Sequence, residues 1–292
     1  MQPYRPLLLR RSNPAGRQGS RWPVVSLLTD FGLRDSYLGQ VKAVIVGIAP
    51  SVQLIDISHE VPAGDVMAGA MTLETAHGAF PRGTVHLCVV DPGVGSDRLA
   101  LAVRIPGSSF VAPDNGLLTP IFQAHPDAVA RSIMHPLLIR SDPAASPDSR
   151  DERPLSATFH GRDLFAVAAA RLAIGFPFAR VGPIVPHPIR LSIPRPVVSD
   201  GAIHGEVVAI DHFGNAATNI TRAYLSKIGS PVEVVCRNVG FGDIRRYYTE
   251  VNAGQPIALL DSASRLELAV NGGSAAGLGL EAGDPVEVKS RA

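Results

Sequence analysis

The chain has 292 residues, which is too long for one small hydrophobic core and favours two domains. Its 46% hydrophobic and 18% charged residues are typical of a globular protein, and its net charge of +1 lacks the basic excess of nucleic-acid binders. No apolar run approaches the roughly 18 residues of a membrane-spanning helix, so we predict neither a nucleic-acid nor a membrane partner.

Residues 1–22 are basic, and their longest continuous apolar run is 7–9. A secretory signal needs roughly 7–15 such residues, so the sequence predicts a flexible tail instead. The two cysteines, Cys88 and Cys236, stand far apart in apolar, strand-like runs. We expect both to be reduced core residues, which fits a cytoplasmic protein.

Residues 23–195 are predicted to form an N-terminal α/β domain with a central, largely parallel sheet, because strand and helix patterns alternate. Strands are expected over 24–30, 52–58, 84–90, 98–105 and 108–113. Helices are expected over 36–50, 64–81 and 162–175, with Asp35 capping the first and Asp65 opening the second.

Two polar or proline-rich segments interrupt this pattern. Residues 141–154 are predicted to be a mobile surface loop, and the proline-rich stretch 177–200 an interdomain connector. Residues 196–292 are then predicted to form a smaller all-β barrel domain. Its expected strands are 205–211, 231–237, 256–261, 265–270 and 285–290.

Polar side chains follow three predicted strands of the first domain: Asp30, Asp91, and the pair Asp114 and Asn115. Ligands of open α/β sheets bind beyond the carboxyl ends of the strands. Each residue alone could be a turn former, but three such positions in one domain favour a binding site. Asp30 suits two adjacent hydroxyls, because a carboxylate offers two acceptor oxygens.

The stretch "CVVDPGVGSDRLALAV" (88–103) lacks the glycine and lysine pattern of a phosphate loop and does not open a helix. No Cys/His cluster has metal-ligand spacing, and no serine lies in a nucleophile elbow, so we predict no metal. The sequence therefore indicates a nucleoside-like ligand without phosphate contacts.

In the second domain, Asp211 and Ser262 could hold an ammonium group and Asn215 a carboxylate or base edge, unless they are only turn residues.

Seven stretches, in order over about residues 24–290, resemble the S-adenosylmethionine (SAM) hydroxide adenosyltransferase family, which also includes fluorinase and chlorinase relatives. They are "LLTDFGLRDSYLGQVK", "DISHEV", "VVDPGVGSDR", "APDNGLL", "TFHGRD", "DHFGNAATN" and "LELAVNGGSAA". The resemblance implies conversion of SAM and water to adenosine and L-methionine. It implies no further cofactor, since SAM is the substrate, and a homotrimer with sites between subunits.

The resemblance also implies roles for individual residues. The catalytic triad would be Asp91, Arg98 and His160, and Asp30 would bind the ribose diol. Asp211 and Ser262 would hold the amino acid, and Asn215 and the backbone near Asn271 would meet the adenine. Asn115 is also expected among the substrate-binding residues, without a specific contact.

The chemistry fits these residues, because the departing thioether is neutral and needs no general acid. The enzyme needs a positioned water in line with C5′ and a pocket drier than bulk solvent. Asp91 would orient that water, Arg98 would keep Asp91 ionised, and His160 could pass the proton onward.

Two other functions fit part of the pattern. The halogenating relatives carry Tyr at the position of Asp91 and Ser at the position of Gly161, so a SAM-dependent halogenase is the first alternative. A nucleoside- or SAM-binding protein without turnover is the second. It would need the ligand-gripping residues but not a triad at the reacting centre.

Overall fold

The computed structural model describes residues 22–139 and 156–291. The chain divides into two compact units, 1–191 and 192–292, a few residues from the boundary expected after residue 195. The loop predicted over 141–154 lies outside the described residues, as does the predicted N-terminal tail apart from Trp22.

The first unit is built on a six-stranded sheet in the order β2-β1-β3-β5-β4-β6. Its strands are β1 (Val24–Thr29), β2 (Gln53–Ser58), β3 (Thr84–Val89), β4 (Ala100–Ile105), β5 (Ser108–Pro113) and β6 (Val129–Ser132). The first four strands of the order pair in parallel, whereas β4 is antiparallel to both β5 and β6. The predicted α/β domain with a largely parallel sheet is confirmed.

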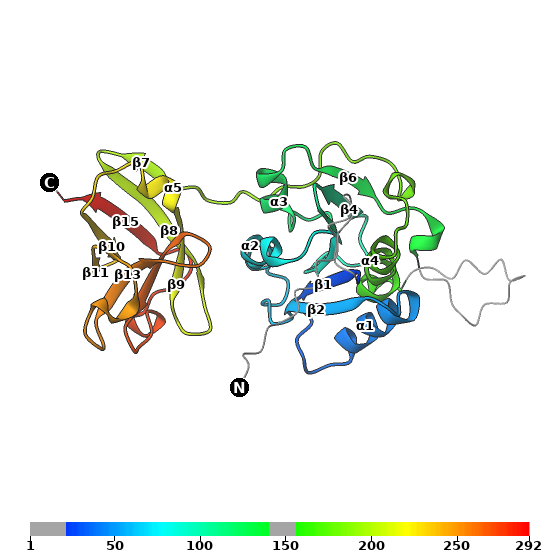
Figure 1. Cartoon of the computed structure of the whole chain (residues 1–292), viewed down its shortest axis with the longest axis horizontal. Helices are drawn as coiled ribbons and strands as arrows, with labels where there is room; N and C mark the ends of the chain where they lie inside the picture. Colours follow the sequence, from blue (N-terminus) through cyan, green and yellow to red (C-terminus); the bar gives the residue numbers. More distant parts are fainter. Residues whose placement is uncertain (1–21, 140–155, 292) are drawn as a thin grey trace, which may run out of the picture. The chain divides into compact units, whose positions relative to one another are not determined.

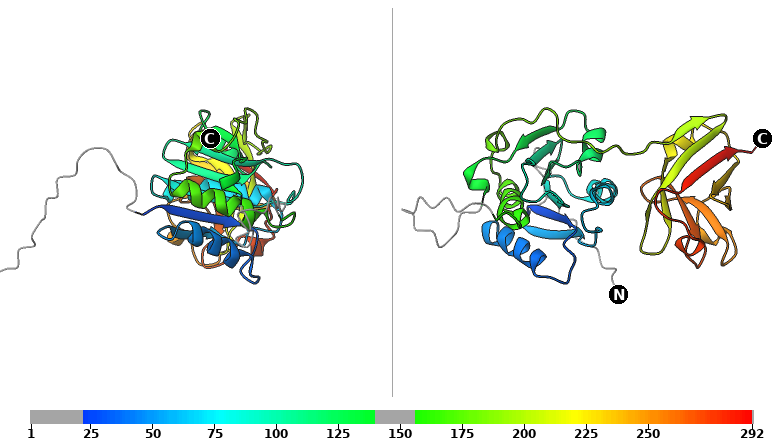
Figure 2. Two further views of the ribbon diagram at one scale, coloured as in Figure 1. Left: turned by 90° about the vertical axis from the view of Figure 1, so that its right-hand side faces the viewer. Right: turned by 180° about the vertical axis from the view of Figure 1, so that it is seen from behind.

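Helices cover both faces of this sheet (Figure 1). They are α1 (Tyr37–Ile48), α2 (Val66–Ala76), α3 (Thr119–Ala124) and α4 (Ala166–Ala173), and a π-helical turn (Gly161–Phe165) leads into α4. Buried side chains of α1 and α4 pack on one face and those of α2 and α3 on the other. The right-hand view in Figure 2 shows the same layering from behind.

The helix starts differ from expectation at one position. The side chain of Asp65 accepts a hydrogen bond from the amide of Ala68 and caps α2, as its sequence position suggests. The N-cap residue of α1 is Ser36, so the prediction that Asp35 caps this helix is wrong. A capping side chain reaches the first helical amides from the N-cap position, and Asp35 lies one residue before it.

A buried histidine, His86, lies on β3 in the middle of the sheet. The Nδ1 of His86, on β3, lies 2.7 Å from the Oγ of Ser26 on β1, and its ring stacks on Phe110 of β5 at 4.7 Å. Burial, with a smaller contribution from His77, lowers the pKa of His86 to about 3. The ring is therefore neutral near pH 7.

Because His86 is buried in its neutral form, we expect the free energy of unfolding to fall in acid. The unfolded chain binds a proton at His86 near pH 6.5 and the folded chain only near pH 3, so the stability from this group is lost as pH falls between those values. The slope is up to about 1.4 kcal/mol per pH unit. Chemical unfolding of His86→Gln from pH 7 to pH 4 should show a shallower loss than the parent. The exposed His187→Gln is the control and should keep the parent's slope.

The second unit is a nine-stranded, nearly closed barrel, as the predicted all-β barrel domain requires. Its main path runs β11-β10-β15-β8-β9-β14-β13-β12, and β7 pairs with β8. The strands are β7 (Val197–Ser199), β8 (Ala202–Ile210), β9 (Ala216–Thr221), β10 (Val232–Cys236), β11 (Val239–Gly242), β12 (Ile244–Arg245), β13 (Pro256–Leu260), β14 (Arg265–Val270) and β15 (Pro285–Ser290). A short helix, α5 (Arg222–Leu225), follows β9.

Both cysteines are free and buried, Cys88 in the first unit and Cys236 in the second. Burial raises the pKa of both thiols. Within the described residues, no helix is long and apolar enough to cross a membrane.

Candidate active site

The loop between β3 and β4 holds a buried ion pair. The Nε of Arg98 lies 2.9 Å from Oδ1 and 3.1 Å from Oδ2 of Asp91, and its Nη2 also donates to Oδ2. The two side chains are only 8% and 5% exposed. Arg98 also lies over the ring of Phe165, 5.1 Å from its centroid. Because an unpaired charge at this depth is costly, each partner holds the other in place.

The backbone of this loop is shaped by its own turn contacts. The Oγ of Ser96 donates to the carbonyl of Gly93 at 2.7 Å, and the amide of Val94 donates to the carbonyl of Asp91 at 3.3 Å. Gly95 has φ +81°, and a Cβ there would lie 2.4 Å from the carbonyl oxygen of Ala157. Only glycine permits that approach, which packs the loop against the segment that carries His160.

His160 lies at the start of the π-helical turn, a rare geometry that is frequent at functional sites. Its Nδ1 is 2.9 Å from Nη2 of Arg98. Since a guanidinium can only donate, Nδ1 accepts and the neutral ring carries its proton on Nε2. Burial first, and then the charge of Arg98, lower the pKa of His160, and the carboxylates of Asp91 and Asp163 offset this only in part. The imidazole is a neutral hydrogen-bond donor at Nε2.

Three aromatic rings, Phe31, Tyr37 and Phe159, lie beside this histidine. Phe159 meets Phe31 edge-on at 5.9 Å between centroids and Tyr37 at 5.2 Å. A Cβ on Gly161 would lie 2.9 Å from Cζ of Phe31, so a larger residue would displace that ring. Sequence reasoning missed these residues, although Phe31 follows Asp30 and Phe159 precedes His160 directly.

Asp30 follows β1 at the same sheet edge, because Thr29 pairs with Val89 just before Asp91. Its Oδ2 accepts a hydrogen bond from the amide of Gly64 at 2.9 Å. The carboxylate is half-buried, and its Oδ1 has no hydrogen bond within the residues the structure describes. The structure thus brings Asp30 to the edge that carries the Asp91–Arg98 pair and leaves one of its oxygens to accept from a ligand.

Asn115 follows β5 at this edge too, but its amide contacts backbone. Its Nδ2 donates to the carbonyl of Val90 at 2.8 Å, and its Oδ1 accepts from the amide of Leu117 at 3.2 Å. These contacts suit a residue that holds a turn. The predicted presence of Asn115 in the site stays a prediction.

In the second unit, Asp211 and Asn215 form one turn between β8 and β9. Asp211 Oδ1 accepts from the amides of Phe213 and Asn215, and its Oδ2 lies 3.2 Å from Nδ2 of Asn215. Ser262 is exposed in the turn between β13 and β14. The antiparallel register of β9 and β14 puts these two turns at opposite ends of the strand pair, so Asp211 and Ser262 of one copy are not neighbours.

Asn271 lies at the end nearer Asp211, after β14. Its Nδ2 donates to the carbonyl of Val251 at 2.7 Å, and its own amide and carbonyl pair with Gln255 and Gly254. An adenine contact from this backbone would therefore have to come from the residues beside it.

Sequence reasoning also missed a buried acid between these turns. Glu267 on β14 accepts a hydrogen bond from the hydroxyl of Tyr248 at 2.7 Å. Burial, with the nearby charges of Asp211 and Asp261, raises the pKa of Glu267. An alternating strand pattern gives no sign of such a residue, because a glutamate at that position usually faces solvent.

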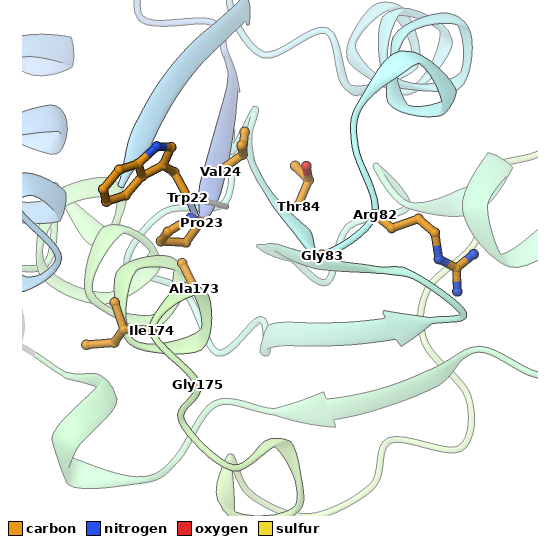
Figure 3. A pocket seen from close by; sticks show the side chains of 9 residues that line it. All are labelled: Trp22, Pro23, Val24, Arg82, Gly83, Thr84, Ala173, Ile174 and Gly175. Carbon is orange, nitrogen blue, oxygen red and sulfur yellow. The ribbon is translucent and has the colours of Figure 1, made fainter. Parts of the chain in front are cut away.

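A hollow of about 360 Å³ lies elsewhere in the first unit, at the amino ends of β1 and β3. Figure 3 shows Trp22 and Ile174 on one side of it and Arg82 on the other. It is at the opposite end of these strands from Asp30 and Asp91, so it is not the candidate site. No group of His, Cys, Asp or Glu within the described residues is arranged to hold a metal ion.

Comparison with known proteins identifies relatives over nearly the whole chain. Residues 25–182 match the SAM hydroxide adenosyltransferase N-terminal domain, and residues 205–287 match the C-terminal domain. A protein of Thermus thermophilus named (R)-S-adenosyl-L-methionine hydrolase is 42% identical, over 90% of this chain and 98% of its own. A protein of Actinoplanes sp. named fluorinase is 29% identical, over 85% of this chain and 91% of its own.

A solved structure matches as well. The crystal structure of an uncharacterised conserved protein from Thermotoga maritima superposes with a TM-score of 0.81 at 37% identity, covering 90% of this chain and 99% of that one.

Proposed function

The chain belongs to the SAM hydroxide adenosyltransferase family, and we propose that it hydrolyses SAM by attack of water at C5′, giving adenosine and L-methionine. The observation that carries the proposal is the buried Asp91–Arg98 pair in contact with His160, at the carboxyl edge of the sheet. The 42% identity to a protein named as a SAM hydrolase supports it, while the relative named fluorinase is more distant.

The reaction needs a nucleophile held in line more than it needs acid or base. Water forms the new C5′–O bond as the C5′–S bond breaks. The electron pair of the C5′–S bond stays on sulfur, so the sulfonium leaves as a neutral thioether. The attacking oxygen then carries an extra proton, which must be lost. Holding water at the reacting carbon supplies most of the catalysis, since a well-oriented reactant gains several kcal/mol.

Asp91 would orient the water and take its proton late. Its carboxylate is paired with Arg98, and Oδ1, which accepts from Nε of Arg98, has a second lone pair that could accept a hydrogen bond from water. His160 is placed differently from the sequence expectation: Nε2 already carries a proton and Nδ1 is engaged by Arg98. His160 can take up a proton only if the Arg98 contact breaks, so we assign it the role of a donor that orients oxygen.

The substrate contacts remain proposals drawn from the family resemblance. Asp30 would bind the ribose diol through its unengaged oxygen. The resemblance assigns Asp211 and Ser262 to the amino acid, although their turns lie at opposite ends of the β9–β14 pair within one copy. It assigns Asn215 and the backbone near Asn271 to the adenine. No metal or further cofactor is proposed, because the departing group needs no electrophilic help.

The division of these residues between the two units supports a second proposal, a homotrimer with sites at the interfaces between copies. Light scattering should then give three copies at working concentration. A monomer that is fully active at nanomolar concentration would contradict the trimer. We also propose a cytoplasmic location, which the two free cysteines favour.

Incubation of the purified chain with SAM in isotopically heavy water and molar chloride tests the function. We expect adenosine labelled at the 5′ oxygen, with L-methionine released in equal amount. A 5′-chloro nucleoside would instead establish the halogenase alternative, and bound but unchanged SAM would establish a binding protein. The structure disfavours halide, because an anion would approach the Asp91 carboxylate and Gly161 offers no hydroxyl.

A further inference from the structure

The turn after β5 holds both stems of the loop that carries Asp91 and Arg98. The amide of Asp114 donates to the carbonyl of Leu99 at 2.9 Å, next to Arg98. The side chain of Asn115 donates to the carbonyl of Val90 at 2.8 Å, next to Asp91. Two successive residues thus fix the two points at which this loop leaves and rejoins the sheet.

The side chain of Asp114 makes its own contact on the far side of that turn. It is buried, at 6% exposure, and its Oδ1 accepts a hydrogen bond from the amide of Ile189 at 2.8 Å. Burial raises the pKa of this carboxyl, and the amide of Ile189 and the charge of Arg190 offset the effect only in part. A buried carboxylate without that amide would be costly, so the contact fixes the turn as well as the segment.

The segment 189–191, which we call the strap, is the last part of the first unit. Its Leu191 amide donates to Oγ1 of Thr119 at 2.8 Å, and its Arg190 lies over the ring of Phe122 at 3.9 Å. Gly116 has φ +96°, and a Cβ there would lie 2.7 Å from Cγ of Leu191. The strap therefore lies flat against the turn, where only glycine fits.

We propose that Asp114 is a positioning residue for the catalytic pair. It ties the strap to the turn, and the turn fixes the Asp91–Arg98 loop through Val90 and Leu99. The proposal rests on the proposed function for its kinetic consequence, but its structural part does not. The strap leads directly into Ser192, where the second unit begins.

The kinetic signature follows from what the loop carries. Asp91 would orient the attacking water and Arg98 holds Asp91, whereas the proposed ribose contact, Asp30, accepts from the amide of Gly64 and has no contact with this turn among the described residues. Loss of the Asp114 side-chain contact should therefore lower kcat more than it raises KM. A misplacement of about 1 Å at a reacting group costs on the order of a hundredfold.

The experiment compares Asp114→Ala, Asp114→Asn and Thr119→Val with the parent. Asp114→Ala should lower kcat about 10- to 100-fold while KM for SAM changes less than about threefold. Asp114→Asn keeps an acceptor for the Ile189 amide and should restore most of kcat. Thr119→Val removes the acceptor of the Leu191 amide at the other end of the strap and should give a smaller loss in kcat. This second variant keeps the proposal testable if Asp114→Ala does not fold.

Asp284→Ala is the matched control. This carboxylate is also 6% exposed and accepts a hydrogen bond from Nε of Arg237 at 2.6 Å, but it belongs to the second unit. It should lose stability without the selective loss in kcat. A similar kcat loss in Asp284→Ala, or none in a folded Asp114→Ala, would overturn the proposal.

Hydrogen exchange of the 92–99 backbone is measured on the same proteins without substrate. Exchange there should accelerate in Asp114→Ala and return towards the parent in Asp114→Asn. Unchanged exchange in Asp114→Ala would refute the coupling even if the chain hydrolyses SAM. Accelerated exchange in a chain that does not hydrolyse SAM would leave the coupling standing and reject the proposed function.

Discussion

An Asp91→Asn variant is expected to remain folded and to lose SAM hydrolysis by about 10²- to 10³-fold. The amide keeps the size of the carboxylate and one acceptor oxygen, but it lacks the charge that orients water and accepts its proton. In the parent, Arg98 engages both carboxylate oxygens, so the amide also turns one donor towards another donor. Turnover is measured as adenosine released, and SAM affinity by calorimetry.

The control for this variant is Asp127→Asn, which removes an exposed carboxylate from the turn before β6. It should hydrolyse SAM at the parent's rate. Calorimetry should show that Asp91→Asn still binds SAM within a few fold. Parent-like turnover by Asp91→Asn would remove Asp91 from the mechanism, and loss of binding would make it a substrate contact instead.

Strand positions in the first unit could be predicted because their residue patterns are unambiguous. β1 and β3 are covered by helices on both faces, so their residues form continuous apolar runs that local sequence reveals. The sequence gives no comparable sign of β6, a four-residue strand of alternating burial. Nor could it show that β5 lies between β3 and β4, since pairing order depends on packing of distant segments.

The candidate site shows the same limit. Asp91 and Arg98 are seven residues apart in one glycine-containing loop, so local sequence is enough to suggest that they meet. His160 is 62 residues from Arg98, and only the family resemblance placed it in the site. That Nδ1 of His160 accepts from Arg98, which changes its proposed role, depends on side-chain geometry that no motif encodes.

Asn115 shows why a motif alone does not assign a role. A polar residue at a strand end is compatible with a ligand contact and with a turn, and the two have the same sequence pattern. The distances show that the side-chain amide of Asn115 contacts the backbone of Val90 and Leu117, and its presence in the site stays a prediction. The importance of Asp114 depends on Ile189, 75 residues away, and could not have been found locally.

Replacing Arg98 should cost more stability than replacing Asp91. Arg98→Met leaves the carboxylate of Asp91, whose side chain is 5% exposed, without its partner. Breaking a buried pair in this way costs about 3–5 kcal/mol of unfolding free energy. Arg98→Met should also abolish hydrolysis and raise the pKa of His160, because a nearby positive charge that lowers it is removed. Denaturant unfolding, adenosine release and histidine NMR titration measure the three effects.

The double variant Asp91→Asn/Arg98→Met separates the structural role of the pair from its chemical role. With both charges gone, no buried charge is left uncompensated, so at least half of the lost stability should return. Hydrolysis should not return, because the group that orients water is still absent. If the double variant were as unstable as Arg98→Met, the loss would come from packing of Arg98 on Phe165 and not from the buried, unpaired charge of Asp91. If hydrolysis returned with stability, the ion pair would be a structural element and Asp91 would have no part in the chemistry.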